Sequence, residues 1–172
     1  MLPVGGPPMN PEIGTMMVYP VHGMAEVIAH EERAVNGETL TYIVFKVEGE
    51  IPADELTICA LQNRLEELGV RHVMSLQDAT DVLEVLSVRS VHLPSSWSRR
   101  FKNHQAKLRT GDAFERAEVV RNLALRLREK PLAFAETAMY KQARSGLIAE
   151  LAVTWGITQH AAAERVTDAL DN

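Results

Sequence analysis

The chain has 172 residues, of which 46% are hydrophobic, and a formal net charge of −5. This length and composition suit one medium domain or two small ones with a buried core, and they exclude a disordered chain. No apolar run reaches the length of about 18 residues that a membrane-spanning helix needs, and the first residues lack the pattern of a signal peptide. Because Cys59 is the single cysteine, no intrachain disulfide can form and a cytoplasmic location is expected.

The charge is distributed unevenly along the chain. Residues 1–67 contain three basic and eleven acidic side chains, a net charge of −8, whereas residues 68–172 contain fifteen and twelve, a net charge of +3. Within residues 89–130 the net charge reaches +7, from eleven basic and four acidic side chains. The acidic total argues against indiscriminate nucleic-acid binding, and a basic region beside an acidic one indicates different partners at the two ends.

The first third of the chain has the pattern of strands and turns. Residues 1–12 are rich in Pro, Gly and Met, and we expect them to form a flexible leader. Asn36-Gly37 is typical of a type I′ hairpin turn. Short strands of β-branched and aromatic residues are predicted at 16–19, 24–29, 34–35, 39–47 and 56–61. Five short strands indicate a small curled sheet or barrel.

After Gly69 the apolar residues recur with the period of a helix. Five helices are predicted. The first includes residues 82–86, the second runs from Ser95 or Ser96 to Thr110, and the third begins after Asp112 and ends at Pro131. The fourth spans about 134–154, and a short fifth helix follows Thr158. The third has an apolar stripe of Phe114, Ala117, Val120, Leu123 and Leu127. The fold class is therefore α+β, with a small β module over residues 13–67 and an all-α module of about five helices over residues 68–172.

Signatures of catalysis are missing from the sequence. It has no phosphate-binding Gly-rich loop, no CxxC pair and no HExxH, and its six histidines show no ligand spacing. No nucleophile and base stand in a recognisable arrangement. We therefore expect no metal, no cofactor, no small-molecule substrate and no enzymatic activity, and a catalytic function is the most remote interpretation.

One basic stretch suggests a contact with nucleic acid. No Asp or Glu occurs from Val91 to Gly111, and Trp97 is followed by Arg99, Arg100 and Lys102. An aromatic residue among bases and without acids is typical of nucleic-acid contacts.

The position of Trp97 on its helix leaves two interpretations open. Helical geometry places Phe101 about 40° from Trp97 on one apolar face. In one interpretation Trp97 is core, DNA is not contacted, and the chain is a protein-interaction module. In the other, the ring at the helix start is a wedge against a disrupted base step, with basic side chains on the phosphates.

Motifs of one known family recur along the chain. Residues 13–23 contain a YPxHG-like turn, residues 36–47 are similar to the family's central hairpin, residues 97–102 match W-S-R-R-[YF]-K, and residues 117–123 match A-E-V-V-R-x-L. From about Ile13 to the C-terminus, the chain thus resembles the CarD family (CarD and CdnL proteins) of bacterial RNA polymerase-binding transcription factors.

The resemblance implies the partners and the residues that contact them. It implies a Tudor-like β module that binds the RNA polymerase β subunit, with Arg33 at a polymerase-contact position. It implies that Trp97 lies against the minor groove of promoter DNA at the upstream edge of the melted region, with Arg99, Arg100 and Lys102 as phosphate or groove contacts. The family's L-T-V-R-V-P strand is altered here, because Cys59 replaces a basic polymerase contact and the proline is missing.

These observations predict a non-enzymatic transcription regulator. Its β module docks on the polymerase by edge-strand pairing with the β subunit, and its Trp97 wedge modulates the stability of the open complex. A further alternative keeps the DNA contact but replaces the polymerase with another protein, because Cys59 stands at the contact position.

Overall fold

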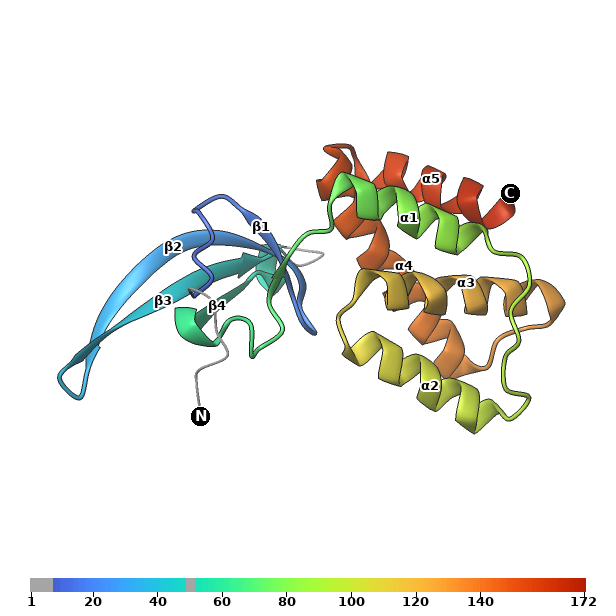
Figure 1. Cartoon of the computed structure of the whole chain (residues 1–172), viewed down its shortest axis with the longest axis horizontal. Coiled ribbons are helices and arrows are strands. Elements are labelled where there is room, and N and C mark those ends of the chain that lie inside the picture. Colours follow the sequence, from blue (N-terminus) through green and yellow to red (C-terminus); the bar gives the residue numbers. More distant parts are fainter. Residues whose placement is uncertain (1–7, 49–51) are drawn as a thin grey trace. The chain divides into compact units, whose positions relative to one another are not determined.

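The computed structural model describes residues 8–48 and 52–172 of the chain. The chain divides into two compact units, Met1–Val73 and Met74–Asn172, and each is described by itself (Figure 1). The predicted boundary after residue 67 lies too early. A two-residue strand, Arg71–His72, pairs with the strand Met16–Tyr19 and so belongs to the sheet.

The first unit contains a five-stranded antiparallel sheet with the order β4-β3-β2-β1-β5. Its strands are β1 (Met16–Tyr19), β2 (Gly23–Val35), β3 (Glu38–Val47), β4 (Leu56–Leu61) and β5 (Arg71–His72), and two short 3-10 helices are η1 (Pro52–Asp54) and η2 (Gln62–Arg64). Strands β4 and β5 form the two edges of this sheet.

The hairpin of β2 and β3 dominates the sheet and is visibly curved (Figure 1). Asn36 and Gly37 both have positive φ, 52° and 84°, as a type I′ turn requires. Two strands predicted separately at 24–29 and 34–35 are one continuous strand, because Ala29 to Val35 all pair with β3. Alternating buried positions form the core of the sheet, with Met17, Ala25, Val27, Ile43, Phe45, Ala60, Leu65 and Val70.

Residues 8–12, the described part of the predicted leader, contact the rest of the first unit. His30 Nε2 lies 2.8 Å from the carbonyl oxygen of Pro11, and Gln62 donates a hydrogen bond of 3.0 Å to Asn10 Oδ1. Met9 packs against the sheet core. The prediction of a flexible leader is therefore wrong for residues 8–12, and its remaining residues, 1–7, lie outside the described part of the chain.

The second unit contains five helices and confirms the α+β class. They are α1 (Leu76–Ser87), α2 (Trp97–Arg109), α3 (Ala113–Glu129), α4 (Phe134–Trp155) and α5 (Gln159–Asp171). Helix α3 lies among α1, α2 and α4 and packs against each of them (Figure 1). Among residues 8–48 and 52–172, no helix has the length and apolar character needed to cross a membrane.

Most helix ends and core positions in this unit follow the sequence. Asp112 and Thr158 cap α3 and α5 with their side chains, and Gly156 ends α4 in the left-handed conformation. Ala117, Val120 and Leu123 are buried in the predicted stripe of α3. Leu127, predicted in the same stripe, is 48% exposed.

Candidate nucleic-acid interface

Helix α2 begins with an aromatic pair at the surface. The Trp97 side chain is 45% exposed, and its ring stacks on that of Phe101 with a centroid distance of 5.1 Å and an interplanar angle of 15°. Phe101 is half-buried and packs against the core of the helical unit. Trp97 thus rests on the domain through Phe101, and much of its ring stays accessible.

The start of α2 is also electropositive. Ser96 occupies the N-cap position without a side-chain capping bond, and the first turn contains no acidic residue. Arg99 and Lys102 are exposed, and neither forms an ion pair with any residue that the structure describes. Unsatisfied backbone N–H groups give a helix start a partial positive charge. Trp97 therefore lies beside several unneutralised positive groups.

Arg100 is placed differently from its neighbours. Its side chain is 1% exposed, and its Nε lies 3.0 Å from Glu136 Oε1 of α4. Its Nη1 donates to the carbonyl oxygens of Pro94 and Ser95, at 3.1 and 3.4 Å. A side chain buried in this way does not reach a phosphate, so the prediction that Arg100 contacts DNA is wrong. Arg100 is a positioning residue that ties the segment before Trp97 to α4.

A second buried polar residue lies one turn further along α2. His104 is 2% exposed, and burial lowers its pKa to about 4, with smaller effects from the positive charges of Arg100 and Lys107 against the negative charge of Glu136. The inner face of α2 thus carries Arg100 and His104 where an ordinary amphipathic helix carries apolar residues. Sequence reasoning missed this, because it assigned Arg100 to a DNA contact and gave His104 no role.

The predicted polymerase-contact residues meet on the sheet. Arg33 Nη2 lies 3.7 Å from Cys59 Sγ, and the Arg33 guanidinium lies over the Tyr42 ring, 4.6 Å from its centroid. Glu31 forms an ion pair of 2.5 Å with Arg33. Strand register brings β2, β3 and β4 together here, and Cys59 lies on the edge strand β4. Sequence reasoning missed the part of Tyr42, which it placed only in a strand, and that of Glu31.

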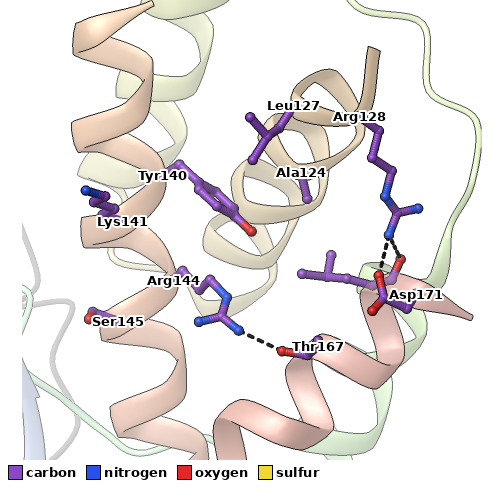
Figure 2. Close-up of a pocket in the computed structure, with 10 residues that line it drawn as sticks. Ala124, Leu127, Arg128, Tyr140, Lys141, Arg144, Ser145, Thr167 and Asp171 are labelled. Carbon is purple, nitrogen blue, oxygen red and sulfur yellow. Dashed lines mark hydrogen bonds and ion pairs between the residues drawn. The ribbon is translucent and has the colours of Figure 1, made fainter. Parts of the chain in front are cut away.

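A cavity opens in the helical unit away from α2. Its volume is about 590 Å³, and it is lined by residues of α3, α4 and α5 but none of α2. Figure 2 shows Arg144 reaching Thr167, and Arg128 reaching Asp171. Leu127 lines this cavity, which explains its exposure. The described residues include no cluster of His, Cys, Asp and Glu that could hold a metal ion.

The CarD C-terminal domain matches residues 81–167, just over half of the chain. The chain therefore belongs to the CarD family, whose members are transcription factors and not enzymes.

A curated relative supports the same assignment. The chain is 29% identical over 148 residues to the protein named "Putative transcription factor YdeB" of Bacillus subtilis (strain 168). The alignment covers 86% of this chain and 94% of the relative. The family resemblance of the sequence motifs is thus confirmed, and it extends over both units.

Proposed function

We propose that the chain is a transcription regulator that binds the RNA polymerase β subunit with its sheet and contacts promoter DNA with α2. The observation that carries the proposal is the exposed Trp97 ring at an uncapped, acid-free helix start. An apolar ring that abuts an unstacked base step, with cations beside it for the phosphates, is a known way of holding distorted DNA.

The proposed regulation rests on a difference between the affinities of the chain for melted and for duplex promoter DNA. Trp97, Arg99 and Lys102 favour the open promoter if they bind melted DNA better than duplex at the upstream edge of the bubble. A difference of about 1.4 kcal/mol shifts the equilibrium between the closed and open states tenfold. Because Arg99 and Lys102 neutralise few phosphates, we expect affinity for free DNA to be weak and sensitive to salt.

Polymerase docking is proposed for the β4 edge of the sheet. Strand β4 has one unpaired edge, and an exposed edge can accept a strand from a partner. Arg33, Tyr42 and Cys59 lie beside that edge and offer a cation, an aromatic ring and a thiol for side-chain contacts. Docking there places the regulator with the polymerase in the cytoplasm.

The DNA contact is tested by comparing two templates of one sequence. With polymerase present, the affinity of the wild-type chain is measured for a fork-junction promoter and for the fully paired promoter. We expect a preference for the fork that Trp97→Ala abolishes. Leu127→Ala is the matched control, because Leu127 is 48% exposed and lies on α3. Loss of the preference in both variants, or in neither, contradicts the proposal.

The polymerase contact is tested separately, by pull-down with the isolated lobe of the β subunit. Cys59→Arg restores a cation at the contact position, and we expect it to strengthen binding, whereas Arg33→Glu should weaken it. Arg64→Glu is the control, because Arg64 is exposed in η2 and pairs locally with Glu67. Unchanged binding by both Cys59→Arg and Arg33→Glu would exclude this edge as the docking site.

A further inference from the structure

A second, smaller cavity lies beneath α2. Its volume is about 190 Å³, and it is lined by the segment 91–94 together with residues of α2 and α3. Four of the lining side chains are both polar and buried, namely Arg100, His104, Arg121 and Asn122, with exposures of 1%, 2%, 9% and 4%. Buried polar groups need hydrogen-bond partners, so the partners of these four determine what the cavity can hold.

The hydrogen bonds among these residues fix the positions of the protons. Arg121 donates to Asn122 Oδ1 from Nε and Nη2, at 3.1 and 3.0 Å. The other amide atom, Asn122 Nδ2, is therefore a donor, and it lies 3.3 Å from His104 Nε2. With a pKa of about 4, His104 is neutral at pH 7, so Nε2 accepts this bond and the ring proton is on Nδ1.

Two donors of the lining residues have no acceptor. His104 Nδ1 and Arg100 Nη2 are both buried, and neither has a hydrogen-bond partner among the described residues. A group that satisfies them must offer acceptors, as an oxyanion or a water molecule does. The charge of the lining distinguishes between these two.

The charge of the lining points to the oxyanion. Arg100 is paired with Glu136, and Lys107 is paired with Glu118. Arg121 has only neutral acceptors, Asn122 Oδ1 and, at 3.5 Å, the carbonyl oxygen of Val85. Burial lowers the pKa of Arg121, with Glu118 acting in the opposite direction, but a guanidinium stays charged in proteins. One buried cation thus lacks a carboxylate partner in the described structure, and buried charges are normally compensated.

We propose that this cavity is a binding site for a small oxyanion, with inorganic phosphate as the representative ligand. The anion compensates the charge of Arg121, which lines the cavity. The cavity has the volume of about six water molecules at roughly 30 Å³ each, which is enough for such an ion and some hydration. The site joins the segment 91–94 to α2 and α3, and it does not depend on the proposed contact with DNA.

The test is thermal unfolding of the full chain in a phosphate series, with ionic strength held constant by chloride. Mass action predicts that the unfolding temperature rises with the logarithm of the phosphate concentration, by about 3–6 °C at ten times the dissociation constant. Isothermal calorimetry under the same conditions should give one site per chain. A rise in proportion to the phosphate concentration, with no binding heat, would mean that the cavity holds water only and would overturn the proposal.

Three variants locate the site. Asn122→Asp supplies Arg121 with a carboxylate from the chain, so it should raise the unfolding temperature without phosphate and abolish the phosphate response. Arg121→Met should abolish the phosphate response because it removes the cation. If Arg121→Met does not fold, the phosphate response of Asn122→Asp tests the site. Arg144→Met is the control, because Arg144 lines the other cavity and its acceptor, Thr167, is also neutral. A full response in Asn122→Asp, or its loss in Arg144→Met, would overturn the assignment.

Discussion

Arg99 and Arg100 are adjacent in the sequence but lie in opposite environments. Arg99 is exposed, whereas Arg100 is buried and paired with Glu136. The run of bases was correctly predicted to be helical, but its charge pattern did not show which side faced inward. The partner of Arg100 is 36 residues away, and only the packing of α4 on the helical core brings it close.

The first prediction compares the free energies of unfolding of Arg100→Ala and Arg99→Ala, measured in urea. Arg100→Ala leaves Glu136 buried without its closest partner, since Arg126 Nε is 3.7 Å away, and we expect a loss of about 3–5 kcal/mol in the free energy of unfolding. Arg99→Ala removes an exposed side chain and should change it by less than about 0.5 kcal/mol. Similar losses in the two variants would contradict the burial of Arg100.

The second prediction concerns the contribution of Trp97 to stability. Because its ring is 45% exposed and rests on Phe101, we expect Trp97→Ala to lower the free energy of unfolding by about 1 kcal/mol, mostly from the lost stacking. Leu123→Ala, at a fully buried position of α3, should cost about 2–5 kcal/mol. If Trp97→Ala costs as much as Leu123→Ala, Trp97 is a core residue and the wedge has no basis.

The third prediction follows from the pKa of His104. This pKa is lowered from 6.5 to about 4 in the folded chain, so between these values the unfolded chain binds a proton that the folded chain does not. The free energy of unfolding should therefore fall as the pH drops through this window, by at most about 1.4 kcal/mol per pH unit. Above about pH 6.5, the contribution of neutral His104 to the free energy of unfolding is fully retained.

The pH dependence is assigned by comparing two histidine variants in urea unfolding. His104→Gln should flatten the dependence between about pH 4 and 6.5. His160→Gln should leave it unchanged, since the His160 side chain is 87% exposed. A wild-type slope that survives in His104→Gln would show that other groups are responsible.

At the scale of elements, α1 and α2 start differently. Ser75 caps α1 in a complete capping box, with its side chain accepting from Asp78 N and the Asp78 side chain accepting from Ser75 N. Ser96 stands at the same position of α2 without a capping bond. The first backbone donors of α2, beside Trp97, thus have no side-chain cap.

The fourth prediction uses this contrast between the helix starts. Ser75→Ala should lower the free energy of unfolding by about 1 kcal/mol, as the loss of an N-cap bond usually does. Ser96→Ala should lower it by no more than a few tenths, because no such bond is lost. Equal costs in urea unfolding would show that Ser96 caps α2 in solution.

Most elements could be predicted from local patterns, and the exceptions have physical causes. Asn36-Gly37, Asp112 and Gly156 each set a boundary where the structure has one. Strand β2 was divided in two because His30 to Arg33 are polar, although β3 pairs with them throughout. Strand β5 was missed because two residues make no pattern, and only pairing with β1 defines them as a strand.

At the scale of the molecule, the charge difference follows the two units. Met1–Val73 contains eleven acidic and four basic side chains, whereas Met74–Asn172 contains twelve and fourteen. The sequence therefore predicted two modules with different electrostatic character. It could not predict the buried Arg121–Asn122–His104 chain, because these contacts depend on how α2 and α3 pack.

The most direct test of the proposed function is the lifetime of the open promoter complex. Lifetimes are measured with the wild-type chain, Trp97→Ala and the control Leu127→Ala, at concentrations that give equal polymerase occupancy. We expect the wild-type chain and Leu127→Ala to lengthen the lifetime equally, and Trp97→Ala to return it to that of polymerase alone. Equal lifetimes for the wild-type chain and Trp97→Ala would contradict the wedge.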